Sequence, residues 1–212
     1  MLVAHRGYYT KFAPENSMLA FKKCVEKNIP FELDVHLTKD KKVVVFHDYN
    51  LLRMTGLNKK IEDTTYKELQ NLYLDKTQEK IPLLIDVLKM NNDKVFMLIE
   101  LKNKKIGPLE DEVLKITKDY NNFYFQTFKL KSIYYLKKRT NRKVGLLTMN
   151  RISKKLINSK KIDFISHNLF TLEKIKTKKE VFIFNVNSKT ELELAKKYSD
   201  NFIVDIANIL GK

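Results

Sequence analysis

Residues 29–48 read IPFELDVHLTKDKKVVVFHD, two apolar runs joined by a short charged segment. The first run, 29–34, carries two carboxylates and is typical of a buried strand. The second run, 43–47, begins after eight intervening residues, whereas a parallel return needs a crossover of about a dozen. The sequence therefore predicts that the second run folds back on the first as a β-hairpin.

The hairpin brings a histidine close to a carboxylate. A two-residue turn at Asp40–Lys41 pairs Asp34 with His47 and places both side chains on one face. Asp-Gly is the preferred sequence for such a turn, so Lys41 is an imperfect choice there. A shift of one residue in this register would move His47 to the other face.

Beyond this hairpin, apolar runs alternate with segments of helical periodicity along the whole chain, which is typical of βαβ units and a parallel sheet. Strands are predicted at 2–5, 29–34, 95–101, 123–127, 143–148, 162–166, 181–186 and 202–205. Helices are predicted at 16–27, 82–91, 109–119, 129–139, 151–159, 171–177 and 189–198. The pattern indicates an α/β protein, a (β/α)₈ barrel of the TIM type with an extra β-hairpin strand after strand 2. An open doubly wound sheet is the weaker alternative, because no glycine-rich loop follows the first strand.

Composition and charge limit the functional classes. The length of 212 residues predicts a single barrel domain over 1–212, and the one cysteine, Cys24, excludes an internal disulfide. No signal segment or membrane-spanning run is visible, which predicts a cytoplasmic location. The net charge of +16 favours phosphate-bearing partners, yet the lysines are spread along predicted helices and no nucleic-acid-binding signature is present. We expect no specific nucleic acid partner, while weak association with an anionic membrane surface and the oligomeric state stay open.

Three carboxylates lie at the carboxyl ends of predicted barrel strands, where barrel enzymes build their active sites. Glu32 and Asp34 are two residues apart and share one face of a strand, and Glu100 projects from the next barrel strand. Burying three like charges together is costly unless a cation offsets them. Oxygen ligands suit Mg²⁺ or Ca²⁺, so the sequence predicts one divalent cation here rather than three separate acids.

Two histidines and two cations complete this cluster. The unperturbed pKa of about 6.5 allows one of His5 and His47 to accept a proton while the other donates one. Arg6 stands where the first strand ends, so its guanidinium can turn toward the mouth and bind phosphate oxygens. Lys102 shares the face of Glu100, where it either contacts phosphate or forms an ion pair.

Other residues have weaker claims to a functional role. His36 shares the face of the carboxylates and is interpreted as structural or peripheral, and His167 is a lower-ranking pocket candidate. Tyr8 and Tyr9 either shape the entrance or simply pack, with packing favoured. Cys24 has no activating neighbour and is interpreted as an inert apolar residue.

The order and spacing of these motifs resemble the glycerophosphodiester phosphodiesterase family. The motifs, stronger in the N-terminal half, are AHRG (4–7), PENS (14–17), ELDVHLTKD (32–40), VVFHD (44–48), LLRMTG (51–56), ELK (100–102), FQTF (125–128), FNVN (184–187) and IVDIAN (203–208). The resemblance implies catalysis by His5 and His47, metal ligation by Glu32, Asp34 and Glu100, and phosphate contacts by Arg6 and Lys102. It also implies that Gln126 touches substrate and that Glu15 supports the mouth.

A few positions depart from the family pattern. Lys41 stands where the family usually has Gly, and Phe184 occupies a position usually held by Trp. Val204 and Ile206 belong to an altered form of a Thr-Asp-x-Pro motif around Asp205. These last three changes lie at the mouth and affect the alcohol pocket rather than the metal or proton-transfer groups.

Together with the resemblance, the site residues imply metal-dependent hydrolysis, and the resemblance implies that the substrates are glycerophosphodiesters, such as glycerophosphocholine or glycerophosphoethanolamine, cleaved to glycerol 3-phosphate and an alcohol. The resemblance implies His5 as base and His47 as acid, with either water or the substrate's own glycerol hydroxyl as nucleophile. One alternative is a phospholipase-type phosphodiesterase on intact lipids at a membrane surface, although the sequence shows no clear apolar loop or amphipathic anchor. Another is a non-catalytic basic barrel that binds phosphate or nucleic acid, which the full set of polar groups disfavours.

Overall fold

The computed structural model describes residues 1–102, 104–150, 153–174 and 177–211. Its strands are β1 (Leu2–Ala4), β2 (Phe31–Leu37), β3 (Val43–Val45), β4 (Met97–Leu101), β5 (Phe123–Thr127), β6 (Val144–Thr148), β7 (Phe164–Asn168), β8 (Glu180–Val186) and β9 (Asn201–Val204). The strand β2 extends past its predicted end because β3 pairs with its last three residues.

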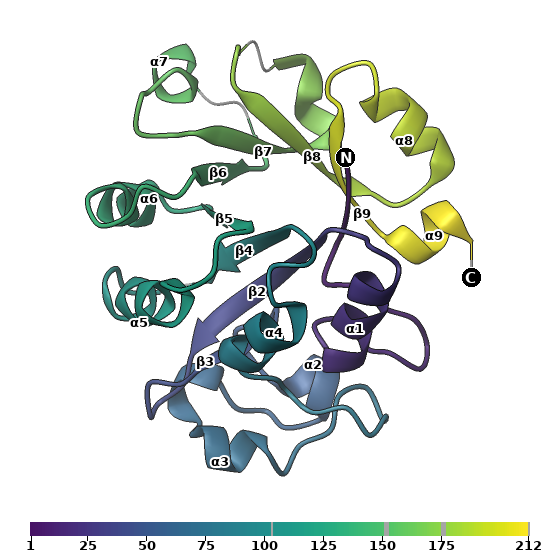
Figure 1. Cartoon of the computed structure of the whole chain (residues 1–212), viewed down its shortest axis with the longest axis vertical. Coiled ribbons are helices and arrows are strands. Elements are labelled where there is room, and N and C mark those ends of the chain that lie inside the picture. Colours follow the sequence, from purple (N-terminus) through teal and green to yellow (C-terminus); the bar gives the residue numbers. More distant parts are fainter. Residues whose placement is uncertain (103, 151–152, 175–176, 212) are drawn as a thin grey trace.

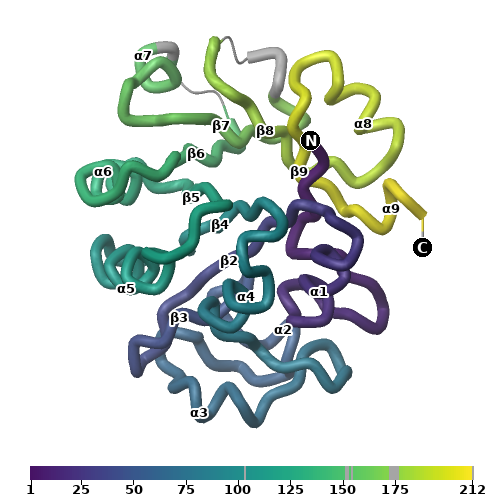
Figure 2. Tube along the Cα trace, viewed as in Figure 1, coloured from purple at the N-terminus to yellow at the C-terminus, as the bar shows by residue number. Residues whose placement is uncertain are grey.

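The strands of the described residues form one closed ring with an additional strand outside it. The sheet order is β1-β9-β8-β7-β6-β5-β4-β2-β3, and β1 also pairs with β2. All ring pairings are parallel, whereas β3 is antiparallel to β2. Figure 1 shows the helices placed around this ring, and Figure 2 shows the first strand passing beside the last one. The predicted (β/α)₈ barrel with an extra hairpin strand is confirmed.

The helices mostly follow the predicted periodicity. They are α1 (Met18–Glu26), α2 (Leu52–Thr55), α3 (Tyr66–Leu69), α4 (Leu84–Asn91), α5 (Pro108–Thr117), α6 (Leu130–Lys137), α7 (Lys154–Ile157), α8 (Lys189–Ala195) and α9 (Ile206–Leu210), with 3₁₀ turns η1 (Ile61–Asp63) and η2 (Leu169–Lys174). Within the described ranges, no helix combines the length and apolar character needed to cross a bilayer.

Two helix predictions need correction or restriction. The segment predicted as a helix over 171–177 contains the end of the 3₁₀ turn η2 instead, and its residues 175–176 lie outside the described residues. The prediction over 151–159 is met only by α7, and residues 151–152 are likewise outside the described residues. The short elements α2, η1 and α3 were not predicted, because three or four residues are too few to show a helical period.

The hairpin forms, but the predicted register is wrong by one residue. Val45 lies opposite Val35 and Val43 lies opposite Leu37, so Asp34 faces the segment one residue before His47. The cause is a three-residue loop in place of the predicted two-residue turn. The backbone of Lys41 takes a left-handed φ of 59°, which closes this longer loop.

Two apolar layers position the site. The larger core fills the space between the outer faces of the strands and the surrounding helices. A smaller cluster contains Val3, Leu98, Phe164, Phe182 and Ile203, which come from five different strands of the ring. Side chains from strands around a ring can contact one another only inside it, so this cluster fills the barrel interior.

Candidate active site

The three predicted carboxylates meet at the carboxyl ends of two neighbouring strands. Glu32 and Asp34 lie on β2 and Glu100 lies on β4, where Asp34 and Glu100 are register partners. One carboxylate oxygen from each lies within 4.8 Å of the others, and all three residues are buried. An all-oxygen donor set of this size suits a hard divalent cation.

The pKa values of these carboxyl groups show that it is unfavourable to bury three negative charges close together. Burial and the charges of Asp34 and Glu100 raise the pKa of Glu32 well above its usual value. Burial and the charge of Asp34 raise the pKa of Glu100 to about 7. For Asp34 burial acts in the same direction, but Lys102, His47 and Arg6 hold its pKa below the usual value. A divalent cation would favour the charged form of all three carboxylates, so the residues fit such an ion.

Two cations face these carboxylates. Lys102 Nζ lies 2.9 Å from Glu100 Oε1 and 3.5 Å from Asp34 Oδ1. Arg6 has a left-handed φ of 55°, and its backbone N–H donates a hydrogen bond to Glu32 Oε2 at 3.1 Å. The Arg6 guanidinium was predicted to turn toward the mouth of the barrel. In the structure its Nη1 donates a hydrogen bond to Glu15 Oε1 at 2.9 Å.

His5 directly follows the first barrel strand and is held by an aspartate that directly follows the last one. Its backbone N–H donates to the carbonyl of Val204, and its Nδ1 lies 3.3 Å from Asp205 Oδ1. Burial and the neighbouring Asp205 raise the pKa of the Tyr9 hydroxyl. Within the described residues His5 Nε2 has no hydrogen-bond partner, so this atom is available for proton transfer.

His47 reaches the same site despite the shifted register, because β3 ends two residues before it. Its Nδ1 lies 2.5 Å from Asp48 Oδ1, and Asp48 Oδ2 accepts from Arg53 Nε at 2.6 Å. Arg53 also donates to Glu15, which links the two sides of the mouth. Burial, with the charges of Lys102 and Arg6, lowers the pKa of His47.

Asn16 is the residue that sequence reasoning passed over most clearly. It is buried, its Nδ2 donates to Asp34 Oδ2 at 2.9 Å, and its Oδ1 accepts from the backbone N–H of Asp34 at 3.3 Å. Its φ of 56° is one that Asn tolerates better than most residues. The pattern PENS contained it, but no chemical signal linked it to Asp34.

A cavity of about 180 Å³ opens above the carboxylates and brings together most of the predicted site. Its polar lining is His5, Arg6, Glu32, His47, Glu100, Lys102, Gln126 and Asn185. Its apolar lining is Phe128, Leu147, Met149, Phe184 and Ile203. Gln126 is fixed by a hydrogen bond from Ser166 Oγ to its Oε1 at 2.7 Å. Asp34 lies beneath this lining, tied to Asn16 and Arg6.

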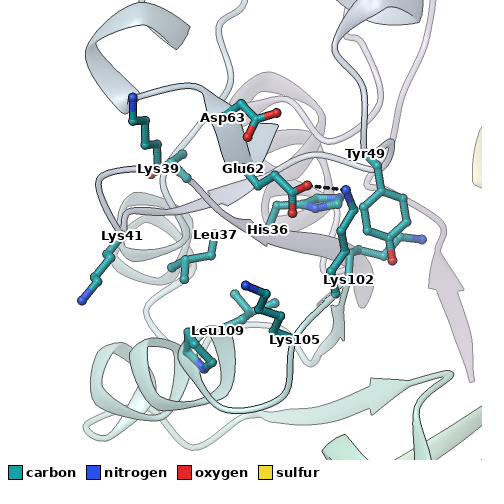
Figure 3. A pocket seen from close by; sticks show the side chains of 13 residues that line it. His36, Leu37, Lys39, Lys41, Tyr49, Glu62, Asp63, Lys102, Lys105 and Leu109 are labelled. Carbon is teal, nitrogen blue, oxygen red and sulfur yellow. Dashed lines mark hydrogen bonds and ion pairs between the residues drawn. The ribbon is translucent and has the colours of Figure 1, made fainter. Parts of the chain in front are cut away.

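A second cavity of about 490 Å³ lies on the other side of Lys102. Figure 3 shows lysines around it, with Glu62 paired to one of them and Lys105 turned inward. The paired lysine is Lys104, whose ammonium also lies 5.4 Å from the centre of the Tyr49 ring. Lys102 lines both cavities, so the basic surface adjoins the candidate active site.

The remaining histidines and Cys24 lie apart from the chemistry. His36 Nε2 donates a hydrogen bond to the carbonyl oxygen of His47 at 3.1 Å, and burial lowers the pKa of His36 to about 4, so it is a neutral support for that backbone. The pocket interpretation of His167 is wrong, because its Nε2 is engaged by Thr171 and it lines neither cavity. Burial raises the pKa of the Cys24 thiol to about 12.

Comparison with known proteins agrees with this geometry. Residues 5–168 match the model of the glycerophosphoryl diester phosphodiesterase family. The chain is 31% identical to the putative glycerophosphodiester phosphodiesterase YhdW of Bacillus subtilis, a match that covers 100% of this chain and 96% of YhdW. A match to YqiK, from the same organism, spans only about half of that relative, 53%.

Solved structures share the architecture. A glycerophosphodiester phosphodiesterase from Thermotoga maritima has a TM-score of 0.79 at 28% identity, covering 99% of this chain and 96% of that one. An Oleispira antarctica phosphodiesterase in complex with the product sn-glycerol-3-phosphate has a TM-score of 0.86 at 20% identity, covering 99% and 94%. At 20% identity, the similarity to the Oleispira structure shows only that the two proteins share a fold.

Proposed function

The chain belongs to the glycerophosphoryl diester phosphodiesterase family, and on that premise we propose that it hydrolyses glycerophosphodiesters such as glycerophosphocholine or glycerophosphoethanolamine. The products are glycerol 3-phosphate, the product bound in the Oleispira structure, and an alcohol. The observation that carries the proposal is one cavity in which two carboxylate-held histidines adjoin three buried acids.

Glu32, Asp34 and Glu100 are the residues that would hold one divalent cation, Mg²⁺ or Ca²⁺. When bound, the cation polarises a phosphoryl oxygen and offsets negative charge in the transition state. Asn16 orients Asp34 for this task through two hydrogen bonds. Lys102 balances two of the carboxylates and lies where it can also reach a phosphate oxygen.

Arg6 is proposed to bind the phosphate beside Lys102. Its Nη1 is held by Glu15, whereas its Nη2 makes no hydrogen bond within the described residues. The guanidinium is thus oriented by one carboxylate with a donor left for the substrate. Two fixed cations near the transferring group stabilise the charge that develops there.

Proton transfer is assigned to the two histidines. Asp205 engages Nδ1 of His5 and Asp48 engages Nδ1 of His47, so in each ring the Nε2 atom faces the chemistry. We assign His5 as the base and His47 as the acid. An acid must be protonated before the reaction, whereas the pKa of His47 is lowered in the free protein. The negative charge of the bound phosphodiester therefore has to raise the pKa of His47 so that the ring carries a proton.

The other wall of the cavity receives the carbon part of the substrate. Phe128 and Phe184 meet edge to face with ring centres 6.4 Å apart, and Met149 and Leu147 lie beside them. Gln126 supplies a fixed amide at the boundary between the apolar and polar walls. We further propose that 1–212 acts as a single domain and that the enzyme works in the cytoplasm.

The test is glycerol 3-phosphate release from a panel of glycerophosphodiesters with each metal. His5→Ala and His47→Ala should each lower turnover by about 10² or more, because general acid–base catalysis contributes that much. His167→Gln is the matched control, since this histidine lies outside both cavities. Turnover within twofold of wild type in both alanine variants, or full activity in excess EDTA, would contradict the proposal.

A further inference from the structure

Four exposed apolar side chains lie in loops at the mouth of the barrel, and two of them are the most exposed large apolar side chains of the described residues. Phe12 follows β1 and is 76% exposed, and Phe170 follows β7 and is 73% exposed. Phe128 follows β5 and Met149 follows β6, and each is 46% exposed. Loops after the carboxyl ends of barrel strands gather on one face, the face that carries the active site. We call these four side chains the apolar rim.

The rim continues into the catalytic cavity. Phe128 and Met149 belong to the cavity lining, and Phe184 packs against Phe128. Single exposed apolar residues are ordinary on a protein surface. Four from separate loops, on the face of the active site and continuous with its apolar wall, are typical of an interaction surface instead.

Positive charge accompanies the rim. Lys11 precedes Phe12 in the sequence and is exposed. The second cavity, shown in Figure 3, is lined by Lys39, Lys41 and Lys105, which form no ion pair within the described residues. Apolar side chains flanked by uncommitted lysines match the surface of an anionic bilayer, where apolar groups enter the acyl boundary and cations meet lipid phosphates.

We propose that this face docks on an anionic lipid surface, with the apolar rim inserted and the lysine-lined cavity against the headgroups. The inference rests on the proposed function, because docking presents the active site to glycerophosphodiesters that carry an acyl chain. On such a lysophospholipid, the oxygen of water forms a bond to phosphorus and the P–O bond to the head-group alcohol breaks. A proton from the water goes to the oxygen of the leaving alcohol, and an acylglycerol phosphate remains. This surface supplies the apolar loops that the sequence did not reveal.

The absence of tryptophan from the chain allows a site-specific optical test. Phe170→Trp places a single indole on the rim, and Leu194→Trp places one near the end of α8, away from the mouth. With vesicles of phosphatidylcholine and phosphatidylglycerol, the emission of the rim indole should shift to the blue and that of the control should not. No shift at the rim, or equal shifts at both positions, overturns the proposal.

Vesicle flotation tests the same face without a reporter. The double variant Phe12→Ser/Phe170→Ser should bind anionic vesicles about tenfold more weakly or worse, because it removes two large apolar anchors. Leu194→Ser is the matched control and should bind as wild type does. Equal binding of wild type to vesicles of phosphatidylcholine alone contradicts the role of the lysines.

Activity on a soluble substrate separates this inference from the proposed function. The double variant should keep wild-type turnover of glycerophosphocholine and lose turnover of lysophosphatidylcholine held in anionic vesicles. Glycerophosphocholine turnover without vesicle binding overturns the docking surface alone. Vesicle binding without turnover of any glycerophosphodiester overturns the proposed function alone.

Discussion

At the scale of single residues, the candidate site depends on neighbours that fix the orientation of each proposed catalytic or metal-binding group. Asp34 is held by Asn16, His5 by Asp205 and His47 by Asp48. Partners of this kind set which atom of a ligand or a base faces the substrate. They are harder to find in a sequence than the groups they orient, because an Asn or Asp beside a loop has many ordinary uses.

Asn16 offers a direct test of this support. Asn16→Gly keeps the left-handed backbone and removes only the side chain, so it should weaken Mg²⁺ binding about 10- to 100-fold with the fold intact. Isothermal titration calorimetry measures the affinity. Asn28→Gly is the matched control, since Asn28 has a φ of 52° but is exposed and lies outside the site. Equal affinities for all three proteins would show that Asn16 only shapes the loop.

The Asp48 carboxylate predicts a dependence of stability on pH. Although burial acts in the opposite direction, Arg53 and His47 lower its pKa to about 2 in the folded protein, against about 3.9 in an unfolded chain. A depressed folded pKa contributes stability above the unfolded value and loses it as pH falls through the folded value. The unfolding free energy of wild type should therefore fall more steeply between about pH 4 and pH 2 than that of Asp48→Asn.

Urea unfolding followed by circular dichroism at several pH values gives these slopes. Asp119→Asn is the control, because Asp119 is exposed and pairs only loosely with Lys118 at 3.9 Å. If Asp48→Asn loses stability with the same slope as wild type, Asp48 is not the titrating support of His47.

At the scale of elements, the hairpin shows where local rules were sufficient and where they were not. Chain length between 29–34 and 43–47 required a hairpin, and the hairpin is present. Its register depended on whether Lys41 could take a left-handed backbone conformation, which the residue type disfavours. The prediction assumed the shorter loop, and the molecule uses the longer one with the strained lysine.

The conformation of Lys41 predicts a stabilising substitution. Glycine adopts a positive φ without the steric cost that lysine has there, although it loses more conformational entropy on folding. The net effect of Lys41→Gly should be a rise of about 0.5–1 kcal/mol in the free energy of unfolding. Lys42→Gly, at a position without a positive φ, should lower stability. Urea unfolding measures both variants. A lower stability for Lys41→Gly would mean that the lysine side chain contributes contacts that outweigh the backbone strain.

Regular strands were the most predictable elements. The strand β5 has the predicted ends, and β6 differs by one residue, because both are short apolar runs between polar loops. The strand β7 begins two residues late, since the Asp163 carboxylate accepts from Lys137 and from the backbone of Val144 instead of extending the strand. The segment between β3 and α4 escaped prediction because its helices are single turns held by caps such as Thr65.

At the scale of the whole molecule, the order of strands around the ring brought together residues that the sequence keeps far apart. His5 and Asp205 lie 200 positions apart and meet because β1 pairs with β9. A closed barrel requires its first and last strands to pair, so the predicted fold class already placed most of the site residues close together. The apolar rim did not, because exposure of Phe12 and Phe170 depends on how each loop packs rather than on residue type.

The interior of the ring predicts one substitution that the fold cannot accept easily. Gly145 lies on β6, and a Cβ there would stand 2.2 Å from the ring of Phe164. Phe164 also contacts Phe182, with ring centres 5.3 Å apart, so it has little room to move. Gly145→Ala should therefore lower the free energy of unfolding by about 1–3 kcal/mol or more.

A double-mutant cycle identifies the cause of that loss. Phe164→Leu alone should destabilise the barrel by leaving space in its interior. Combined with Gly145→Ala, the added methyl group occupies part of that space, so the double variant should lose less stability than the sum of the single losses. Strict additivity in urea unfolding would instead place the cost of Gly145→Ala in the backbone of β6. Because this layer lies beneath the catalytic cavity, the same cycle shows whether the barrel interior supports the site above it through packing.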